Sequence, residues 1–214
     1  MSTTKTDLIN NLIKEGYLKT PRIIEAFRKI DRADFVPENL KDEAYIDAPL
    51  SIGAGQTISQ PLTVAFMFEL LQPESGDMIL DIGYGSGWTT ALLAEIVGTR
   101  GRVFAIERVA ELYEFGKRNV EKYNFVEKGI VECACADGTK GWVEKAPFDK
   151  ILASASAKEL PEAWKEQLKI EGRIVAPIEW SVWLYIQKEK GKFEKFEYPG
   201  FSFVPLISDA NAAN

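Results

Sequence analysis

The sequence predicts an α/β fold with a mainly parallel, doubly wound sheet, and three observations support this prediction. Between residues 78 and 177, short apolar runs alternate with segments of helical periodicity, as in strands joined by helical crossovers. A turn that contains three glycines follows the first apolar run directly. Beyond residue 181 the pattern changes to two alternating stretches, so the sheet should end in antiparallel strands.

Two helices should precede this sheet. Apolar residues recur with helical spacing over residues 8–13 and again over residues 23–30. Thr20 and Pro21, which come directly before the second stripe, are residue types that begin helices. Residues 32–60 show little periodicity, which indicates irregular backbone.

The remaining elements form the core. The expected strands are residues 78–82, 102–106, 130–134, 148–153 and 173–177, and the expected helices are residues 61–71, 89–97, 109–123 and 161–168. A hairpin should join residues 182–189 to residues 193–207 through a turn at residues 190–192. We therefore expect a single domain over residues 1–214, with residues 61–214 as the core and residues 1–60 as an N-terminal helical extension.

Composition excludes several classes of protein. The 214 residues carry a formal net charge of −6 and no cluster of lysines and arginines that could neutralise phosphates, so no nucleic-acid partner is expected. No apolar run is long enough to span a bilayer, and the polar N-terminus lacks the apolar centre of a signal peptide. We therefore expect a cytoplasmic protein with no membrane partner.

The chain contains no histidine, which excludes Ser-His-Asp and Cys-His catalysis, and no metal site is expected. Cys133 and Cys135 lie two residues apart on a predicted strand, a spacing that suits neither a disulfide nor a redox pair. We expect both thiols to be buried and inert. Any chemistry must proceed without an imidazole.

The strongest local signal is the loop at residues 83–87 (GYGSG), which Asp81 precedes by two positions. Glycines let the chain turn sharply and let a ligand approach the main chain, and the helix that follows directs free N–H groups to the same place. A nicotinamide or flavin site requires G-x-G-x-x-G, but Trp88 stands where the last glycine would be. The G-x-G-x-G form with its preceding acid is typical of class I methyltransferases, which hold S-adenosylmethionine on a Rossmann-like core.

Two further acids follow the next strands. Glu107 ends the second strand, where its carboxylate can accept hydrogen bonds from both hydroxyls of a ribose. Asp137, followed by Gly138, comes after the third strand, where it can contact an adenine amine. Asp81 can orient the cationic amino group of the cofactor. Because ligands bind beyond the carboxyl ends of strands in such sheets, these acids should surround one ligand; the alternative is that they are ordinary strand-ending turn residues.

The segment before the core narrows the class further. The stretches DRADFVP (residues 31–37), AYIDAPL (residues 44–50) and IGAGQTISQP (residues 52–61) resemble those of protein-L-isoaspartate O-methyltransferases. The resemblance continues through the glycine loop to FVPL at residues 203–206, so it spans nearly the whole chain. GQTISQP is its most specific part.

This resemblance implies a protein-repair enzyme. It would move a methyl group from S-adenosylmethionine to the free α-carboxylate of L-isoaspartyl residues, with isoaspartyl-containing proteins and peptides as partners. We expect a monomer. Ser59 matches the family's active-site serine, and residues 1–60 lie on the substrate side. The implied cofactor contacts are Thr57, Ile58, Asp81, Gly83, Gly85, Gly87, Glu107, Arg108, Asp137 and Gly138.

The expected reaction suits a chain without histidine. An acceptor carboxylate, with an ordinary pKa near ~4, is already ionised at neutral pH, so no general base is needed. The enzyme can then accelerate the reaction mainly by placing an oxygen in line with the methyl group and by excluding water. Ser59 should hold the acceptor by hydrogen bonding rather than act as a nucleophile, although a hydroxyl there could instead cap the helix that begins at Pro61.

Departures from the family pattern leave alternatives open. Residues 178–183 (IEWSVW) replace a glycine-rich loop, residues 168–172 (LKIEG) lack the usual glycine pair, and Tyr84 stands where a small residue is usual. The cofactor side matches the family better than the acceptor side. One alternative is therefore a methyltransferase that acts on a different carboxylate or small molecule, and another is a non-catalytic binding module that keeps the fold.

Overall fold

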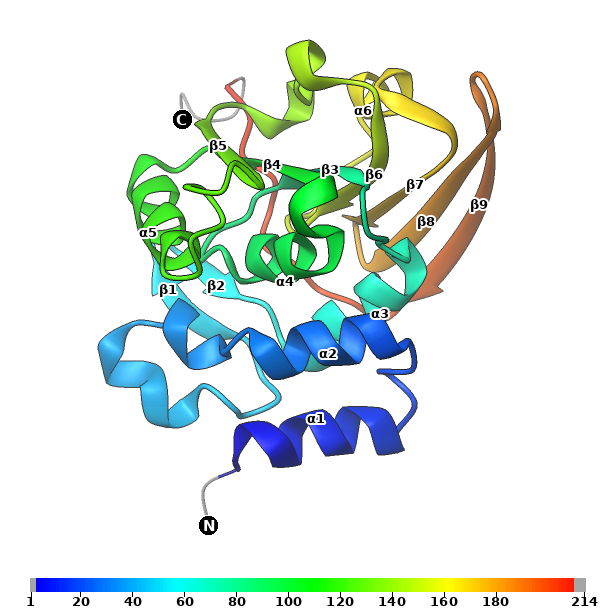
Figure 1. Ribbon diagram of the computed structural model, residues 1–214. Coiled ribbons are helices and arrows are strands. Elements are labelled where there is room, and N and C mark those ends of the chain that lie inside the picture. The colour runs from blue at the N-terminus through cyan, green and yellow to red at the C-terminus, as the bar shows by residue number, and fades with distance from the viewer. Residues whose placement is uncertain (1–2, 210–214) are drawn as a thin grey trace.

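The computed structural model describes residues 3–209 and has a seven-stranded sheet in the order β5-β4-β3-β6-β7-β8-β9 (Figure 1). The strands are β3 (Met78–Ile82), β4 (Arg102–Glu107), β5 (Val131–Cys135), β6 (Phe148–Ala153), β7 (Leu168–Ile178), β8 (Ser181–Glu189) and β9 (Lys192–Pro199). The strands from β3 to β7 pair in parallel, whereas β8 pairs antiparallel with β7 and with β9. The predicted mainly parallel sheet with antiparallel C-terminal strands is confirmed.

The strand order creates a switch point beside β3. From β3 the chain runs outward to β4 and β5 on one side, and it then returns to form β6 and β7 on the other. In sheets of this kind, a crevice opens beyond the carboxyl ends of the strands where the order reverses. The glycine loop at residues 83–87 follows β3 directly and therefore lies at this crevice.

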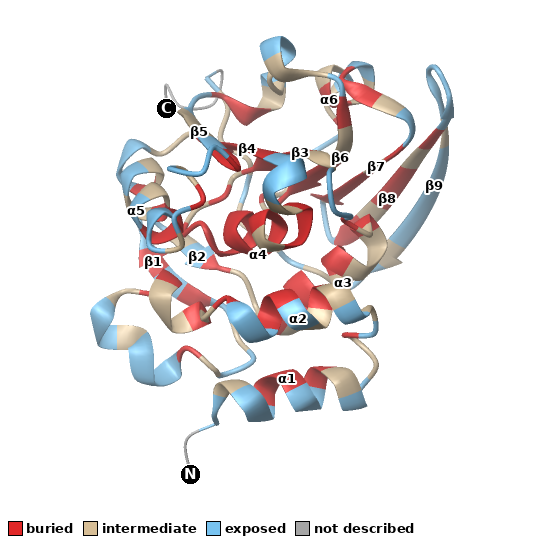
Figure 2. Cartoon of the chain, in the orientation of Figure 1, coloured by how far each residue is buried: buried red, intermediate tan, exposed pale blue. Residues whose placement is uncertain are grey.

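Helices cover the two faces of the sheet unequally. One face carries α3 (Pro61–Leu71), α4 (Trp88–Val97) and α5 (Ala110–Glu121), and α4 is buried on almost every side (Figure 2). The opposite face carries α6 (Glu162–Glu166) and the 3-10 turns η4 (Gly138–Lys140) and η5 (Val143–Lys145); a further 3-10 turn, η3 (Gly98–Arg100), follows α4. None of the helices between residues 3 and 209 combines the length and apolar character that a membrane crossing requires.

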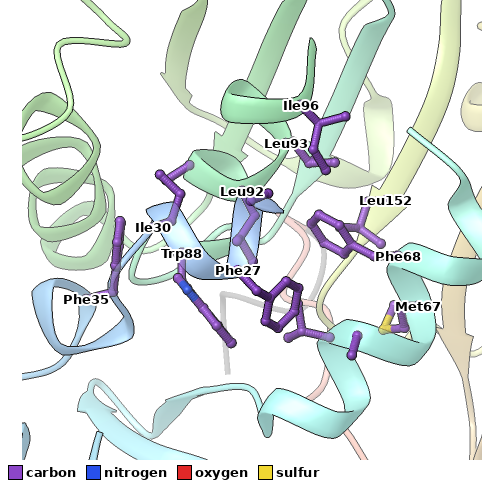
Figure 3. Packing of buried hydrophobic residues seen from close by; sticks show 14 of the residues in the cluster. Phe27, Ile30, Phe35, Met67, Phe68, Trp88, Leu92, Leu93, Ile96 and Leu152 are labelled. Atoms are coloured by element: carbon purple, nitrogen blue, oxygen red, sulfur yellow. The ribbon is translucent and has the colours of Figure 1, made fainter. Parts of the chain in front are cut away.

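The N-terminal extension packs against α3 and α4. Its elements are α1 (Lys5–Lys14), α2 (Pro21–Lys29), η1 (Arg32–Phe35), η2 (Glu38–Glu43) and a hairpin of β1 (Leu50–Gly53) and β2 (Gln56–Ile58). Phe27 of α2 makes edge contacts with Phe68 and Trp88, at ring-centroid distances of 6.3 and 5.5 Å (Figure 3). The extension and the core therefore share one hydrophobic cluster.

The last strand is shorter than predicted. β9 ends at Pro199, and residues 200–207 leave the sheet instead of extending the hairpin. Gly200 has a φ of 96°, and the N–H groups of Gly200 and Phe201 donate to the carbonyl of Trp180 at 3.0 and 3.1 Å. This turn directs the chain toward the carboxyl edge of the sheet, where it crosses the end of β6.

The expectation of two buried cysteines is wrong, because neither side chain is fully buried. Cys133 is half-buried, and burial raises the pKa of its thiol to about 11. Cys135 is exposed. It is the last residue of β5, and β5 is the outermost strand on its side of the sheet, so its side chain reaches solvent.

Candidate functional site

A pocket opens at the carboxyl edge of the sheet beside the switch point and encloses about 710 Å³, mouth included. The glycine loop, the end of β4, the segment around β2 and a C-terminal stretch at residues 204–207 form its walls. The predicted site residues that line it are Thr57, Ile58, Ser59, Gly83, Gly85, Glu107, Arg108 and Gly138.

The glycine loop brings main chain to the pocket wall. Gly83 and Gly85 have φ angles of 71° and 50°, which residues with side chains rarely adopt. The N–H of Gly83 donates to the carbonyl of Ile106 at 2.8 Å, which holds the loop against the end of β4. A Cβ on Gly85 would lie 3.1 Å from Cδ1 of Ile52 in β1, so the extension closes directly over the loop.

Gly87 has a different setting from the other two glycines of the loop. It is the N-cap residue of α4, with a φ of 86°, and it is not among the residues that line the pocket. A Cβ at this position would lie 2.7 Å from the carbonyl oxygen of Gly116 in α5. The structure therefore gives Gly87 a part in the close packing of α5 against the loop.

The Glu107 carboxylate binds main-chain N–H groups through both of its oxygens. Glu107 is 7% exposed and lines the pocket. One carboxylate oxygen accepts a hydrogen bond from the N–H of Gly85 at 2.9 Å, and the other accepts one from the N–H of Val109 at 2.9 Å. Because an ionised carboxylate can accept about four hydrogen bonds, both oxygens keep acceptor capacity for a ligand.

Asp81 lies behind the pocket wall rather than on it. It is fully buried, and its Oδ2 accepts hydrogen bonds from the hydroxyls of Thr89 and Thr90 at 2.9 and 2.6 Å. Its Oδ1 has no hydrogen-bond partner within residues 3–209, and burial raises the pKa of the carboxyl to about 6. Thr89 lines the pocket, so one side chain separates this carboxylate from the ligand space.

Ser59 is among the residues that line the pocket. Its carbonyl accepts a hydrogen bond from Arg32 Nη2 at 3.1 Å, whereas its hydroxyl has no hydrogen-bond partner among the residues that the structure describes. The alternative that Ser59 caps α3 is wrong. Gln60 is the N-cap residue, and the N–H of Leu62 donates instead to the Asp47 carboxylate at 2.8 Å.

A second hollow, which we call the outer groove, meets the pocket at Ser59. The two share Thr57, Ser59, Ser154 and Val204. The outer groove encloses about 690 Å³ with its mouth, and its lining is entirely uncharged. The other residues that line it are Pro49, Gln60, Thr63, Ser202 and Phe203.

Asp137 is not among the residues that line the pocket, although the adjacent Gly138 is. Its Oδ1 accepts hydrogen bonds from the N–H and hydroxyl of Thr139 at 2.9 and 2.7 Å, and its Oδ2 accepts one from the N–H of Asp209 at 3.0 Å. Burial alone would raise the pKa of Asp137, but these hydrogen bonds lower it below its usual value. Asp137 therefore fastens the C-terminal segment beside the pocket.

One wall of the pocket is formed by residues that the sequence does not predict as part of the site. Residues 204–207 line it, and they lie far along the chain from the glycine loop. The N–H of Ser156 donates to the Val204 carbonyl, and the N–H of Leu206 donates to the Ser156 carbonyl, each at 2.8 Å. Segments that cross strand ends carry no periodicity, so the stretch FVPL was the one signal that pointed here.

Comparison with known sequences gives a consistent result. The family described as protein-L-isoaspartate(D-aspartate) O-methyltransferase (PCMT) matches residues 3–211. A protein-L-isoaspartate O-methyltransferase from Methanopyrus kandleri is 42% identical over 206 residues, which cover 94% of this chain and 90% of the relative. Another, from Ignicoccus hospitalis, is 42% identical over 214 residues and covers 98% of this chain and 100% of the relative.

Solved structures share the whole architecture. A putative protein-L-isoaspartate O-methyltransferase from Plasmodium falciparum, crystallised with S-adenosyl-L-homocysteine, superimposes with a TM-score of 0.86 at 25% identity. That match covers 97% of this chain and 99% of the relative. By these matches across its full length, the chain belongs to the protein-L-isoaspartate O-methyltransferase family.

Proposed function

We propose that this protein transfers a methyl group from S-adenosylmethionine to the free α-carboxylate of L-isoaspartyl residues in damaged proteins. The observation that carries the proposal is the junction of the pocket and the outer groove at Ser59. A methyl donor in the pocket and an acceptor in the groove would meet at one hydroxyl. Membership of the family and the S-adenosyl-L-homocysteine held by a structural relative support the same reaction.

The residues around the pocket fit S-adenosylmethionine. The two Glu107 oxygens each keep acceptor capacity, which suits the paired hydroxyls of a ribose. The unsatisfied Oδ1 of Asp81 leaves negative charge beside Thr89, which suits the cationic amino group of the methionine part. Gly138 and Arg108 would flank the base. When bound, the cofactor supplies an electrophilic methyl group on a sulfonium.

The protein promotes the reaction by positioning the acceptor carboxylate next to the methyl donor. An acceptor carboxylate is ionised at neutral pH, because its ordinary pKa lies near ~4, so no side chain has to remove a proton. The Ser59 hydroxyl donates to one carboxylate oxygen and orients the other toward the pocket. Ile58 and Val204, on the pocket lining, exclude water from the junction. Holding two reactants in this way lowers the barrier without acid–base catalysis.

A matched pair of peptides tests the proposal. The protein should methylate a peptide that contains one L-isoaspartyl residue and leave the same peptide with L-aspartate unmodified, as measured by transfer of labelled methyl groups. Equal labelling of both peptides, or labelling of neither, would reject the repair function. The Ser59→Ala variant serves as the site control, since it should lose turnover yet still bind S-adenosyl-L-homocysteine by calorimetry.

A different acceptor is the second candidate, because the turn that replaces the family's glycine-rich loop binds the N–H of Phe201, the neighbour of Ser202 in the outer groove. The Glu179 carbonyl accepts a hydrogen bond from the Ser156 hydroxyl at 3.2 Å, and Trp180 is 72% exposed. Labelling of a whole lysate distinguishes the two candidates. One dominant labelled species without isoaspartate would favour the other acceptor.

We also propose that the protein acts in the cytoplasm as a monomer on protein and peptide substrates rather than on nucleic acid. The net charge of −6 and the uncharged lining of the outer groove support a polypeptide acceptor over a polyphosphate. Sedimentation at working concentration would test the monomer, and a dimeric species would contradict it.

A further inference from the structure

Arg32 is a buried cation that lies directly behind Ser59. The residue belongs to η1 and is 2% exposed. Its Nη1 donates to the carbonyl oxygens of Ala44 and Ile46 at 2.7 and 3.3 Å, and its Nη2 donates to those of Ala48 and Ser59 at 2.9 and 3.1 Å. One side chain therefore ties the segment before the β1–β2 hairpin to the residue proposed to hold the acceptor.

The same guanidinium reaches the cofactor side of the site. Its Cζ lies 5.3 Å from the centroid of the Trp88 ring. Trp88 is the first residue of α4 and lines the pocket immediately after the glycine loop. Arg32 thus contacts both the Ser59 main chain and the helix that begins at the glycine loop.

The charge of Arg32 is not neutralised in its buried setting. Within residues 3–209 it forms no salt bridge with a carboxylate, and its Nε has no hydrogen-bond partner. Burial lowers its pKa to about 10, partly offset by the charge of Asp47, so the group stays cationic at neutral pH. Asp47 is itself exposed and bonded to the N–H of Leu62 and to Gln60, so solvent screens it.

Carbonyl dipoles satisfy the donors of a guanidinium but add no net negative charge. Ser59, where the lining of the outer groove is uncharged, therefore lies next to a buried cation that has no salt-bridge partner among residues 3–209. A carboxylate that binds at the Ser59 hydroxyl would be the missing counter-charge, because a desolvated cation is stabilised by an anion placed nearby.

We propose that Arg32 is a positioning residue of this enzyme, which fixes Ser59 relative to Trp88 and supplies the positive charge that draws the acceptor carboxylate to the Ser59 hydroxyl. This inference rests on the proposed transfer to a carboxylate. It assigns to the extension a direct part in acceptor recognition, from a side chain that never reaches the pocket surface.

The test compares three variants with the wild type. Arg32→Met removes the charge and the donors, and Arg32→Lys keeps the charge with fewer donors. Arg22→Met is the matched control, since Arg22 lies in the same extension and also binds a carbonyl, that of Pro73 at 2.7 Å, but is not among the residues that line the pocket or the groove. Each variant is first checked for folding by its melting temperature and for calorimetric binding of S-adenosyl-L-homocysteine.

Two readouts then decide the question. Hydrogen exchange over residues 44–60 should rise in Arg32→Met, rise less in Arg32→Lys, and stay at the wild-type level in Arg22→Met. For the isoaspartyl peptide, Arg32→Met should lose roughly 100-fold in kcat/KM, as expected when a reacting group is misplaced. Arg32→Lys should recover much of the KM but less of the kcat, and cofactor-product binding should stay near the wild-type value in all three variants.

Unchanged exchange over residues 44–60 in a folded Arg32→Met protein would overturn the proposal, whether or not the peptide is a substrate. Equal kinetic losses in Arg32→Lys and Arg32→Met, in step with their melting temperatures, would also overturn it, because they would show a purely structural residue. If Arg32→Met does not fold, the same readouts on Arg32→Lys decide the matter. A wild type that ignores the isoaspartyl peptide would reject the function proposed above, while the exchange experiment would still decide the positioning role.

Discussion

The ring of Tyr84 occupies the space that a side chain on Gly116 would need. An ideal Cβ on Gly116 would lie 2.5 Å from Cε2 of Tyr84, and the Tyr84 hydroxyl donates to the Tyr113 carbonyl at 2.8 Å. Tyr84 belongs to the glycine loop, and Gly116 belongs to α5. The bulky residue that departs from the family pattern is therefore accommodated under α5 because that helix carries a glycine, and the loop keeps its place at the pocket.

This pairing predicts the effect of Gly116→Ala. Alanine is the better helix former, but its methyl group would overlap both the Gly85 carbonyl oxygen and the Tyr84 ring, and overpacking of this kind costs about 1–3 kcal/mol. We expect a lower melting temperature and weaker binding of S-adenosyl-L-homocysteine, since displacement of Tyr84 shifts the loop. Glu114→Ala, at an exposed position of the same helix, is the control and should leave both unchanged. A Gly116→Ala protein as stable as the wild type would contradict the packing described here.

The buried Asp81 predicts a pH dependence of cofactor binding. Its pKa is raised to about 6, so the carboxyl is ionised above that pH and neutral below it. If the ionised form attracts the cationic amino group, affinity for S-adenosylmethionine should level off well above pH 6 and fall as the pH drops through about 6. In the free protein the same shift has the opposite sign for stability, because protons bind the folded state more tightly, and folding therefore loses stability as pH rises from 3.8 to about 6.

Calorimetry between pH 5 and 8 would measure the binding profile, and Asp81→Asn should flatten it and weaken binding at neutral pH. An unchanged slope in this variant would assign the titration to another group. A wild-type affinity that rises on acidification would contradict the role given to the ionised carboxylate.

Much of this architecture could be predicted from local sequence, and the exceptions have a common cause. The strands and the glycine loop follow from periodicity and from glycines that adopt positive φ, both of which are properties of neighbouring residues. The environment of Asp137 could not be predicted in this way, because the N–H group that donates to its carboxylate belongs to Asp209, far along the chain. Arg32 lies within a stretch that resembles the family. Its partners are main-chain carbonyls, however, and any residue type provides such a carbonyl, so the sequence does not reveal them.

Glu107 provides a sharper test of the pocket itself. In Glu107→Gln, the amide NH₂ would face a main-chain N–H of Gly85 or Val109, and one acceptor group would be lost. Because hydrogen bonds to charged groups contribute about 1.5–3 kcal/mol, affinity for S-adenosyl-L-homocysteine should fall by about 10- to 100-fold. Glu132→Gln is the control, since Glu132 is exposed and pairs with Lys145 at 2.7 Å. Equal affinities in the wild type and Glu107→Gln would remove Glu107 from the cofactor site.

The C-terminal wall of the pocket is followed by an acidic residue, Asp209, that forms ion pairs with two cations. Asp209 accepts hydrogen bonds from Arg108 Nε at 3.0 Å and from the Lys140 ammonium, and the bond from Lys140 lowers the pKa of its carboxyl. Residues 204–207, which line the pocket, come shortly before it. Release of a ligand past this segment should therefore be faster once the pairing is lost.

In Asp209→Asn, dissociation of S-adenosyl-L-homocysteine should accelerate by roughly two- to fivefold, the range expected for exposed ion pairs, and should lose its dependence on salt. Stopped-flow tryptophan fluorescence at low and high salt would follow the rate. Glu189→Gln removes a comparable exposed pair, with Lys192 at 2.7 Å, from the β8–β9 hairpin and should leave the rate unchanged. If Asp209→Asn releases the ligand at the wild-type rate at every salt concentration, the C-terminal segment is held by its main-chain bonds to Ser156, and the ionic contacts are incidental to ligand exchange.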